Sequence, residues 1–233
     1  MGLPVFRYKT RRSSAWAEGP KLQHMGFVSV DIAGASAVSI PILLGKPHRS
    51  REIIVTVDIK NGVSTSRSIT AASISGLFAG SLQTGTTIGG TRLQAIMFPA
   101  PDKLQHGFLS MTFSGSVADY VIASVFRVVG RVKYGEGETD SDTASSAFST
   151  SLNLNACTIN PGGFMLGMGG HTNANLNSVS GADVAAGNLA GAGTTDQFVS
   201  WWRRIEPVSV TPSVTLSWSG SSGAIAGTWS FNP

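Results

Sequence analysis

The sequence predicts an all-β protein, an antiparallel β-sandwich of the jelly-roll type with an extended N-terminal arm. Several stretches alternate apolar and polar residues with the period of two typical of strands, as in residues 28–32 and 53–59. Gly, Pro, Asn and Ser separate these stretches at turn-like intervals. Helical periodicity is almost absent, since residues 141–151 and 183–189 offer at most a turn or two. These observations together predict stacked sheets rather than helices.

The first 25 residues differ from the rest. Residues 1–25 hold five of the 17 Lys and Arg residues against one acid and show no steady periodicity, so we expect an extended arm without a core of its own. Residues 26–233 are expected to form one sandwich domain. Large side chains in such an arm favour docking on a neighbouring subunit, with a disordered tail or a first strand as alternatives. The expected anchors are Phe6, Arg7, Tyr8, Arg11, Arg12 and Trp16.

Strands are predicted in order along the domain. Residues 120–129 are apolar on both faces, which predicts a central, fully buried strand. The pair Asn61-Gly62 predicts a tight hairpin turn. Residues 219–223 predict the turn of a closing hairpin, with Trp218 and Trp229 in the core. The predicted strands are residues 28–32, 53–59, 67–74, 93–98, 109–113, 120–129, 163–168, 197–210, 214–218 and 224–231.

Two long segments are predicted to be loops. Residues 135–147 carry an acidic run, Glu136 to Asp142, whose oxygens make weak calcium binding an alternative to a solvated loop. Residues 173–195 are rich in Asn, Gly and Ala and predict a second, flexible loop.

Motifs that carry enzyme chemistry are missing from the sequence. The four histidines have no metal-ligand spacing, and Cys157 has neither a partner cysteine nor a cationic neighbour. No Gly-x-Ser-x-Gly elbow occurs, and the acids gather in one loop instead of facing each other. We therefore expect no catalytic activity, no metal and no cofactor. A hydrolase hidden in the long loops is the alternative.

A tryptophan pair near the C-terminus is the best candidate for surface contacts. On a strand, Trp201 and Arg203 share one face, and Trp202 and Arg204 share the other. If one pair lies in the core, the other faces an interface or stacks on a sugar ring.

Composition points to an assembly. Charged residues make up 13 % of the chain, against about 25 % in ordinary soluble domains. Neighbouring subunits cover such a surface better than water does, so we expect a homo-oligomer, with a soluble domain of neutral surface as the alternative. The net charge of +4 gives no support for specific nucleic-acid binding. We find neither a signal peptide nor an apolar stretch of transmembrane length, which predicts cytoplasmic synthesis without membrane insertion.

Residues 27–231 resemble the β-sandwich virion structural proteins of tailed bacteriophages. The resemblance is carried by REIIVTVDI at residues 51–59, LSMTFSG at 109–115, YVIASVFRVVG at 120–130, and the closing segment 218–231. It implies a tail, baseplate, fibre or head-decoration protein, located in the virion, with other virion proteins as partners and a trimer by analogy. The alternative is a module that recognises host surface glycans through Trp201, Trp202 or residues 173–177.

Overall fold

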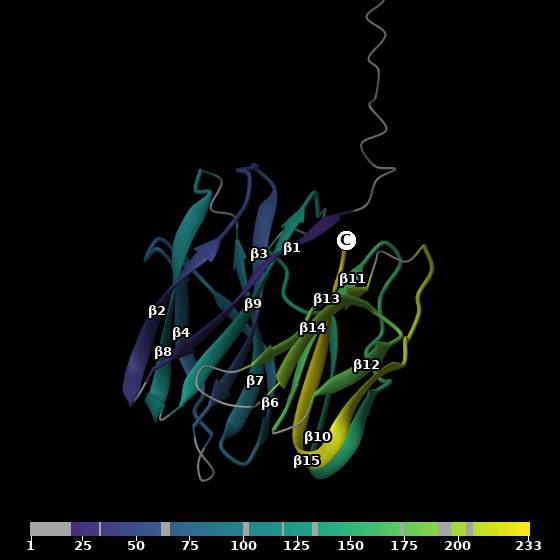
Figure 1. The fold of residues 1–233 in the computed structure, drawn as a ribbon. Coiled ribbons are helices and arrows are strands. Elements are labelled where there is room, and N and C mark those ends of the chain that lie inside the picture. Colours follow the sequence, from purple (N-terminus) through teal and green to yellow (C-terminus); the bar gives the residue numbers. More distant parts are fainter. Residues whose placement is uncertain are drawn as a thin grey trace, which may run out of the picture.

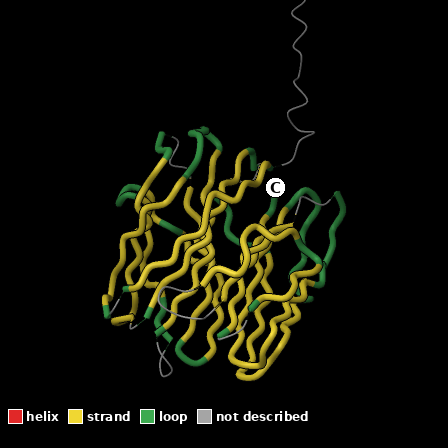
Figure 2. Tube along the Cα trace, viewed as in Figure 1, coloured by secondary structure: helices red, strands yellow, loops and turns green. Residues whose placement is uncertain are grey.

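The computed structural model is built from antiparallel strands (Figures 1 and 2). It describes residues 20–32, 34–61, 66–99, 103–117, 119–131, 135–172, 175–190, 197–203 and 207–233. These residues form fifteen strands and no helix, so the predicted all-β class is confirmed. The described part accordingly holds no helix of the length and hydrophobicity that a membrane span requires.

The strands form three sheets, which we call the outer, middle and C-terminal sheets. The outer sheet has the order β2 (Ala35–Leu43), β8 (His106–Val117), β4 (Ile69–Ile74), β5 (Phe78–Ala79). The middle sheet has the order β1 (Lys21–Asp31), β9 (Tyr120–Val129), β3 (Arg51–Lys60), β7 (Thr91–Pro99), β6 (Ser81–Ile88). The C-terminal sheet has the order β10 (Asp140–Leu154), β15 (Val214–Phe231), β11 (Phe164–His171), β14 (Gln197–Arg203), β13 (Asp183–Ala190), and β12 (Leu176–Ser180) pairs with β15.

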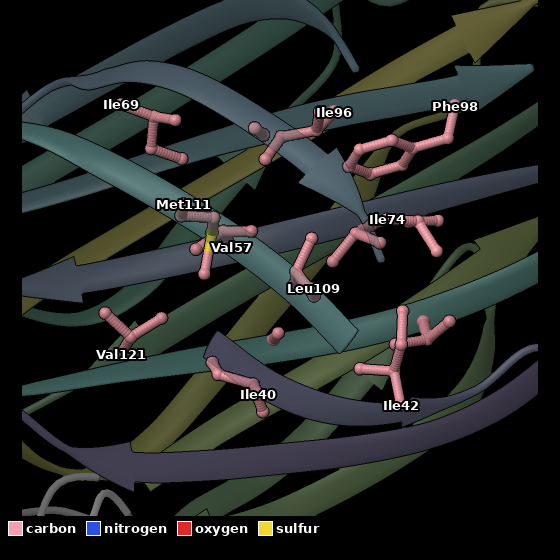
Figure 3. Close-up of a cluster of buried hydrophobic side chains, with 14 of the residues drawn as sticks. Ile40, Ile42, Val57, Ile69, Ile74, Ile96, Phe98, Leu109, Met111 and Val121 are labelled. Carbon is pink, nitrogen blue, oxygen red and sulfur yellow. The ribbon is translucent and has the colours of Figure 1, made fainter. Parts of the chain in front are cut away.

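The middle sheet is covered on both faces. Alternate residues of β3 point to opposite sides, because side chains of a strand alternate. Ile53, Val55, Val57 and Ile59 belong to the cluster shared with the outer sheet, part of which Figure 3 shows. Ile54 belongs to the cluster shared with the C-terminal sheet. β9 is the strand predicted for residues 120–129. It is buried and interior as predicted, but it lies between β1 and β3, and β3 is the central strand of the sheet.

The C-terminal sheet folds back on itself and builds a third core. β15 pairs with β10 along both its halves, but residues 218–221 lie opposite residue 150 alone, which bends the strand. The first half of β15 and β12 then cover the far side of the sheet. The cluster between these layers includes Leu154, Trp201, Leu216 and Trp218.

Two predicted hairpins are wrong. The strands on either side of Asn61-Gly62, β3 and β4, belong to different sheets, so the chain crosses between layers there. Residues 219–223 lie within the single strand β15, which has a bulge at residues 218–221. Both halves of β15 pair with β10 instead of with each other. Trp218 and Trp229 are buried as predicted, but in separate clusters. Turn-forming residues indicate that the chain changes direction. They do not determine which strand each flanking strand pairs with, because that depends on long-range packing.

The first predicted loop is wrong from residue 140 onward and the second over most of its length, and the two weak helical candidates in these segments are strands. Strand β10 occupies residues 140–154, and strands β12 and β13 occupy most of the second predicted loop. Ser and Thr at exposed positions hid the alternation there, because they carry little hydrophobic contrast. The strand predicted for residues 197–210 ends at Arg203. β2 and β6 were not predicted.

Candidate docking surface

The predicted anchors of the arm, Phe6, Arg7, Tyr8, Arg11, Arg12 and Trp16, lie outside the described residues. The described residues begin at Pro20, and β1 starts at Lys21, which pairs with Val129 of β9. Residues 21–25 therefore belong to the middle sheet, and the strand starts earlier than the arm was expected to end. We call residues 1–19 the N-terminal segment.

The N-terminal segment joins the fold at the end of the molecule where β2 ends and β8 begins, the upper end in Figure 1. Arg51 connects these positions. Its backbone pairs with Val129, and its buried side chain donates hydrogen bonds to the carbonyls of Leu44, Gly45 and Leu104 at 3.3, 2.8 and 2.7 Å. This network fixes the loops that follow β2 and precede β8.

An apolar patch lies on the solvent side of the outer sheet at this same end. It consists of Pro41, Leu43, Leu77 and Phe108, which come from β2, the β4–β5 turn and β8. Leu43 is 42 % exposed, Phe108 56 % and Leu77 73 %. Pro41 and Phe108 are direct cross-strand neighbours. A depression of about 350 Å³ lies between them, lined also by Ser75 and His106.

A strained turn holds one side of the patch. Ser75 has a φ of 52°, a conformation that residues other than glycine rarely adopt, and Gly76 follows with a φ of 67°. Two hydrogen bonds hold Ser75. Its N–H donates to the Phe108 carbonyl at 2.7 Å, and its Oγ accepts from the Phe108 N–H at 3.2 Å. The turn thus keeps the exposed Leu77 beside β8.

The four strands of the outer sheet contain no Asp, Glu, Lys or Arg. Its solvent side therefore presents Ser and Thr hydroxyls, with the apolar patch at one end. Charged residues usually protect exposed sheet surfaces from association. Their absence over a whole sheet is typical of a surface that contacts another protein.

The tryptophan pair is packed on both faces of β14. Trp201 is fully buried in the third core, against Gly167 of β11, where any side chain would overlap its ring. Trp202 packs half-buried against the cluster under the middle sheet. Arg203 donates a hydrogen bond to the Gly181 carbonyl at 3.1 Å, and Arg204 lies outside the described residues. Trp201 is thus a core residue and unavailable to a sugar. Glycan recognition therefore stays a prediction that involves Trp202 or residues 173–177 and not Trp201.

The acidic segment has a structural part in the fold. Asp142 Oδ2 accepts hydrogen bonds from the N–H groups of Asn155 and Ala156 at 2.7 and 2.8 Å. Asp140 Oδ2 accepts one from Thr158 N–H at 2.7 Å. Both carboxylates therefore bind the turn after β10 instead of lining a solvated loop. Within the part of the chain that the structure describes, no group of three or more His, Cys, Asp or Glu residues is arranged to hold a metal ion.

Buried polar groups join the middle and C-terminal sheets. His24 Nε2 lies 3.1 Å from Ser124 Oγ, which donates to Ser200 Oγ at 2.8 Å. Burial lowers the pKa of His24 from 6.5, against a raising effect of the Gly26 backbone. Both serines are fully buried. This row of hydrogen-bonded side chains therefore links β1, β9 and β14 through neutral groups.

A buried ion pair closes one end of the same interface. Arg131 Nη1 lies 3.1 Å from Glu52 Oε2, with both side chains fully buried. The Gly135 N–H donates to Glu52 Oε1, and Arg131 Nε donates to the Asn232 carbonyl. Burial raises the pKa of Glu52, and the Arg131 charge opposes that rise.

A pocket of about 270 Å³ lies at the other end, between the middle and C-terminal sheets. Its lining includes Asp58, Lys60, Tyr120, His171 and Phe198. Lys60 Nζ lies 5.8 Å from the centre of the Tyr120 ring. Charged and aromatic groups meet here, but Asp58, Tyr120 and His171 are almost fully buried, so little of the wall is accessible to a ligand.

Cys157 is a buried core residue in the third core. Burial is the largest cause that raises the pKa of its thiol to about 12, so the reactive thiolate is scarce at neutral pH.

The described residues define an all-β protein of three stacked antiparallel sheets with an uncharged outer face. No protein-family model matches the chain, and no curated protein matches it in sequence. Among solved structures the chain is similar to the crystal structure of the PBSX exported protein XepA, with 10 % identity, 91 % of this chain and 86 % of that chain covered, and a TM-score of 0.26. A TM-score this low does not establish a common fold or role.

Proposed function

We propose that this protein is a structural, non-enzymatic component of a tailed-phage virion, of the tail, baseplate, fibre or head-decoration type. It docks on a neighbouring virion protein through its N-terminal segment and displays the stacked sheets. The observation that carries the proposal is the division of charge. Residues 1–19 hold four of the 17 basic residues and one of the 13 acidic residues, and so three of the four net positive charges.

The uncharged outer sheet supports the same function. A large exposed surface without charge leaves a lone molecule poorly solvated, whereas packing in an assembly covers it. The low share of charged residues in the whole chain has the same consequence. We therefore propose a homo-oligomer in the particle, with a trimer as the first state to test.

Deletion of residues 1–19 tests the proposal. The cut must stop before Lys21, because residues 21–25 pair with β9. We expect the shortened chain to keep its thermal unfolding midpoint and to be missing from particles purified after expression in the bacterial host during phage growth. The full chain with the same tag is the control. Equal incorporation of both chains would contradict the docking role.

A further inference from the structure

We propose that the apolar patch on the outer sheet binds the N-terminal segment of a second copy of this chain. The inference rests on the proposed function and deepens it, because it names both the surface that receives the segment and the molecule that carries this surface. Four observations support it: the chemistry of the patch, its position, the composition of the segment, and the direction of β1.

The chemistry of the patch fits aromatic side chains. Leu43 and Phe108 are exposed and line a depression of about 350 Å³, and Leu77 is exposed in the turn between β4 and β5. The turn at Ser75 and the pairing of Pro41 with Phe108 hold the patch in place before anything binds. A preformed apolar surface of this kind loses little entropy when a partner covers it.

The N-terminal segment supplies matching side chains. Phe6 and Tyr8 are two residues apart, so in an extended chain they share one face, and Arg7 and Lys9 share the other. One face then meets the apolar patch while the cations stay in water. The N-terminal segments of two copies are poor partners for each other, because the four basic residues of one segment repel those of the other.

The position of the patch allows the contact. The segment enters the fold at Pro20, at the end of the molecule that carries the patch. The chain from Pro20 back to Tyr8 is about twelve residues long and reaches at most about 40 Å when extended. That length is enough to cross to a neighbouring molecule and still lay Phe6 and Tyr8 on its outer sheet.

The direction of β1 favours a second copy over the chain's own patch. β1 begins at Lys21, at the end of the molecule that carries the patch, and runs from there toward the opposite end at Asp31. β1 also belongs to the middle sheet, and the patch lies on the far side of the outer sheet. To cover its own patch, the segment would have to reverse its direction and pass over the edge of the outer sheet.

Cross-linking between differently tagged copies of the full chain tests this inference. One copy carries Tyr8→Cys and the other Leu43→Cys, and a short bis-maleimide joins cysteines that lie close together. Cys157 remains in both copies, since burial and its raised pKa keep it unreactive while the chain is folded. We expect a covalent product that contains both tags. Adding Phe108→Ser should lower its yield about tenfold without changing the unfolding midpoint.

The matched control moves the second cysteine to Phe148→Cys, an 83 % exposed position in β10 beside the pocket at the opposite end of the fold. Equal cross-linking to this position would overturn the inference. So would the absence of a product between the two tagged copies, or a cross-link formed within single copies of a Tyr8→Cys/Leu43→Cys double variant. The assay uses purified protein without particles. Its failure leaves docking on a different virion protein intact, whereas incorporation of the shortened chain contradicts the proposed function itself.

Discussion

The two faces of the middle sheet differ in chemistry, although both are buried. Toward the outer sheet, the centre of the interface consists of Ile, Val, Leu, Met, Phe and Ala side chains. Toward the C-terminal sheet, buried polar residues stand among the apolar ones, including Glu52, Thr56, Asp58 and Ser124. One strand, β3, contributes to both. Two apolar sheet surfaces can shift relative to each other at little cost, whereas hydrogen-bonded and charged pairs across an interface form in only one relative position of the two sheets. We infer that the polar face specifies how the C-terminal sheet docks.

The largest expected effect tests the polar interface. Arg131→Met leaves the Glu52 carboxylate buried without its partner and removes the hydrogen bond to the Asn232 carbonyl. Breaking a buried ion pair on one side costs about 3–5 kcal/mol of unfolding free energy. Urea unfolding measures the loss. The Arg131→Met/Glu52→Gln double variant, which removes the stranded charge, should recover part of it. A loss below about 1 kcal/mol would mean that the pair behaves as a surface pair.

The next effect tests the apolar interface. Leu109→Ala leaves a cavity in the cluster between the outer and middle sheets and should cost about 2–5 kcal/mol. The matched control is Leu77→Ala at a 73 % exposed position, which should stay within about 0.5 kcal/mol of the wild type. Urea unfolding compares the two. Similar losses for both would show that the outer sheet is not packed as described.

The smallest expected effect is the pH dependence of stability that His24 contributes on the polar face of the middle sheet. Burial lowers the pKa of His24 below 6.5, so the unfolded chain binds a proton more readily than the folded chain. Stability from this residue is present above pH 6.5 and is lost as the pH falls through the folded pKa. The thermal midpoint should therefore fall less between pH 8 and 5 in His24→Gln than in wild type. Glu52 titrates in both chains, so their difference isolates His24. Parallel pH profiles would exclude this role.

Sequence reasoning identified the all-β class and the buried strand β9, because a strand with apolar residues on both faces needs a covering layer on each side. It missed that the polar side of β3 is covered. Alternation of apolar and polar residues predicts a strand. The sequence from Val55 to Ile59 is the same whether Thr56 and Asp58 face water or another sheet, so it cannot show which face is covered. Asp58 is buried only when the C-terminal sheet packs on this face, and that sheet begins with β10, more than eighty residues further along the chain.

The candidate docking surface was also out of reach of the sequence. Leu43, Leu77 and Phe108 lie far apart in the chain and come together through the pairing of β2 with β8 and the turn at Ser75. A weak signal was present, because the strands that form the outer sheet lack charged residues altogether. Trp201 shows the opposite case. An aromatic residue beside Arg suggested a surface, but Gly167 opposite it on β11 provides space for the ring inside the core.

The position of β9 between β1 and β3 has a consequence for folding during synthesis. Its partners β1 and β3 are synthesised long before it, so the middle sheet cannot close until residue 129 has emerged. Pairing over such long sequence separations is slow. During that interval the C-terminal sheet does not yet exist, so the face of the middle sheet that it later covers, with Ile54 and Phe126 beside Thr56 and Asp58, is exposed to water.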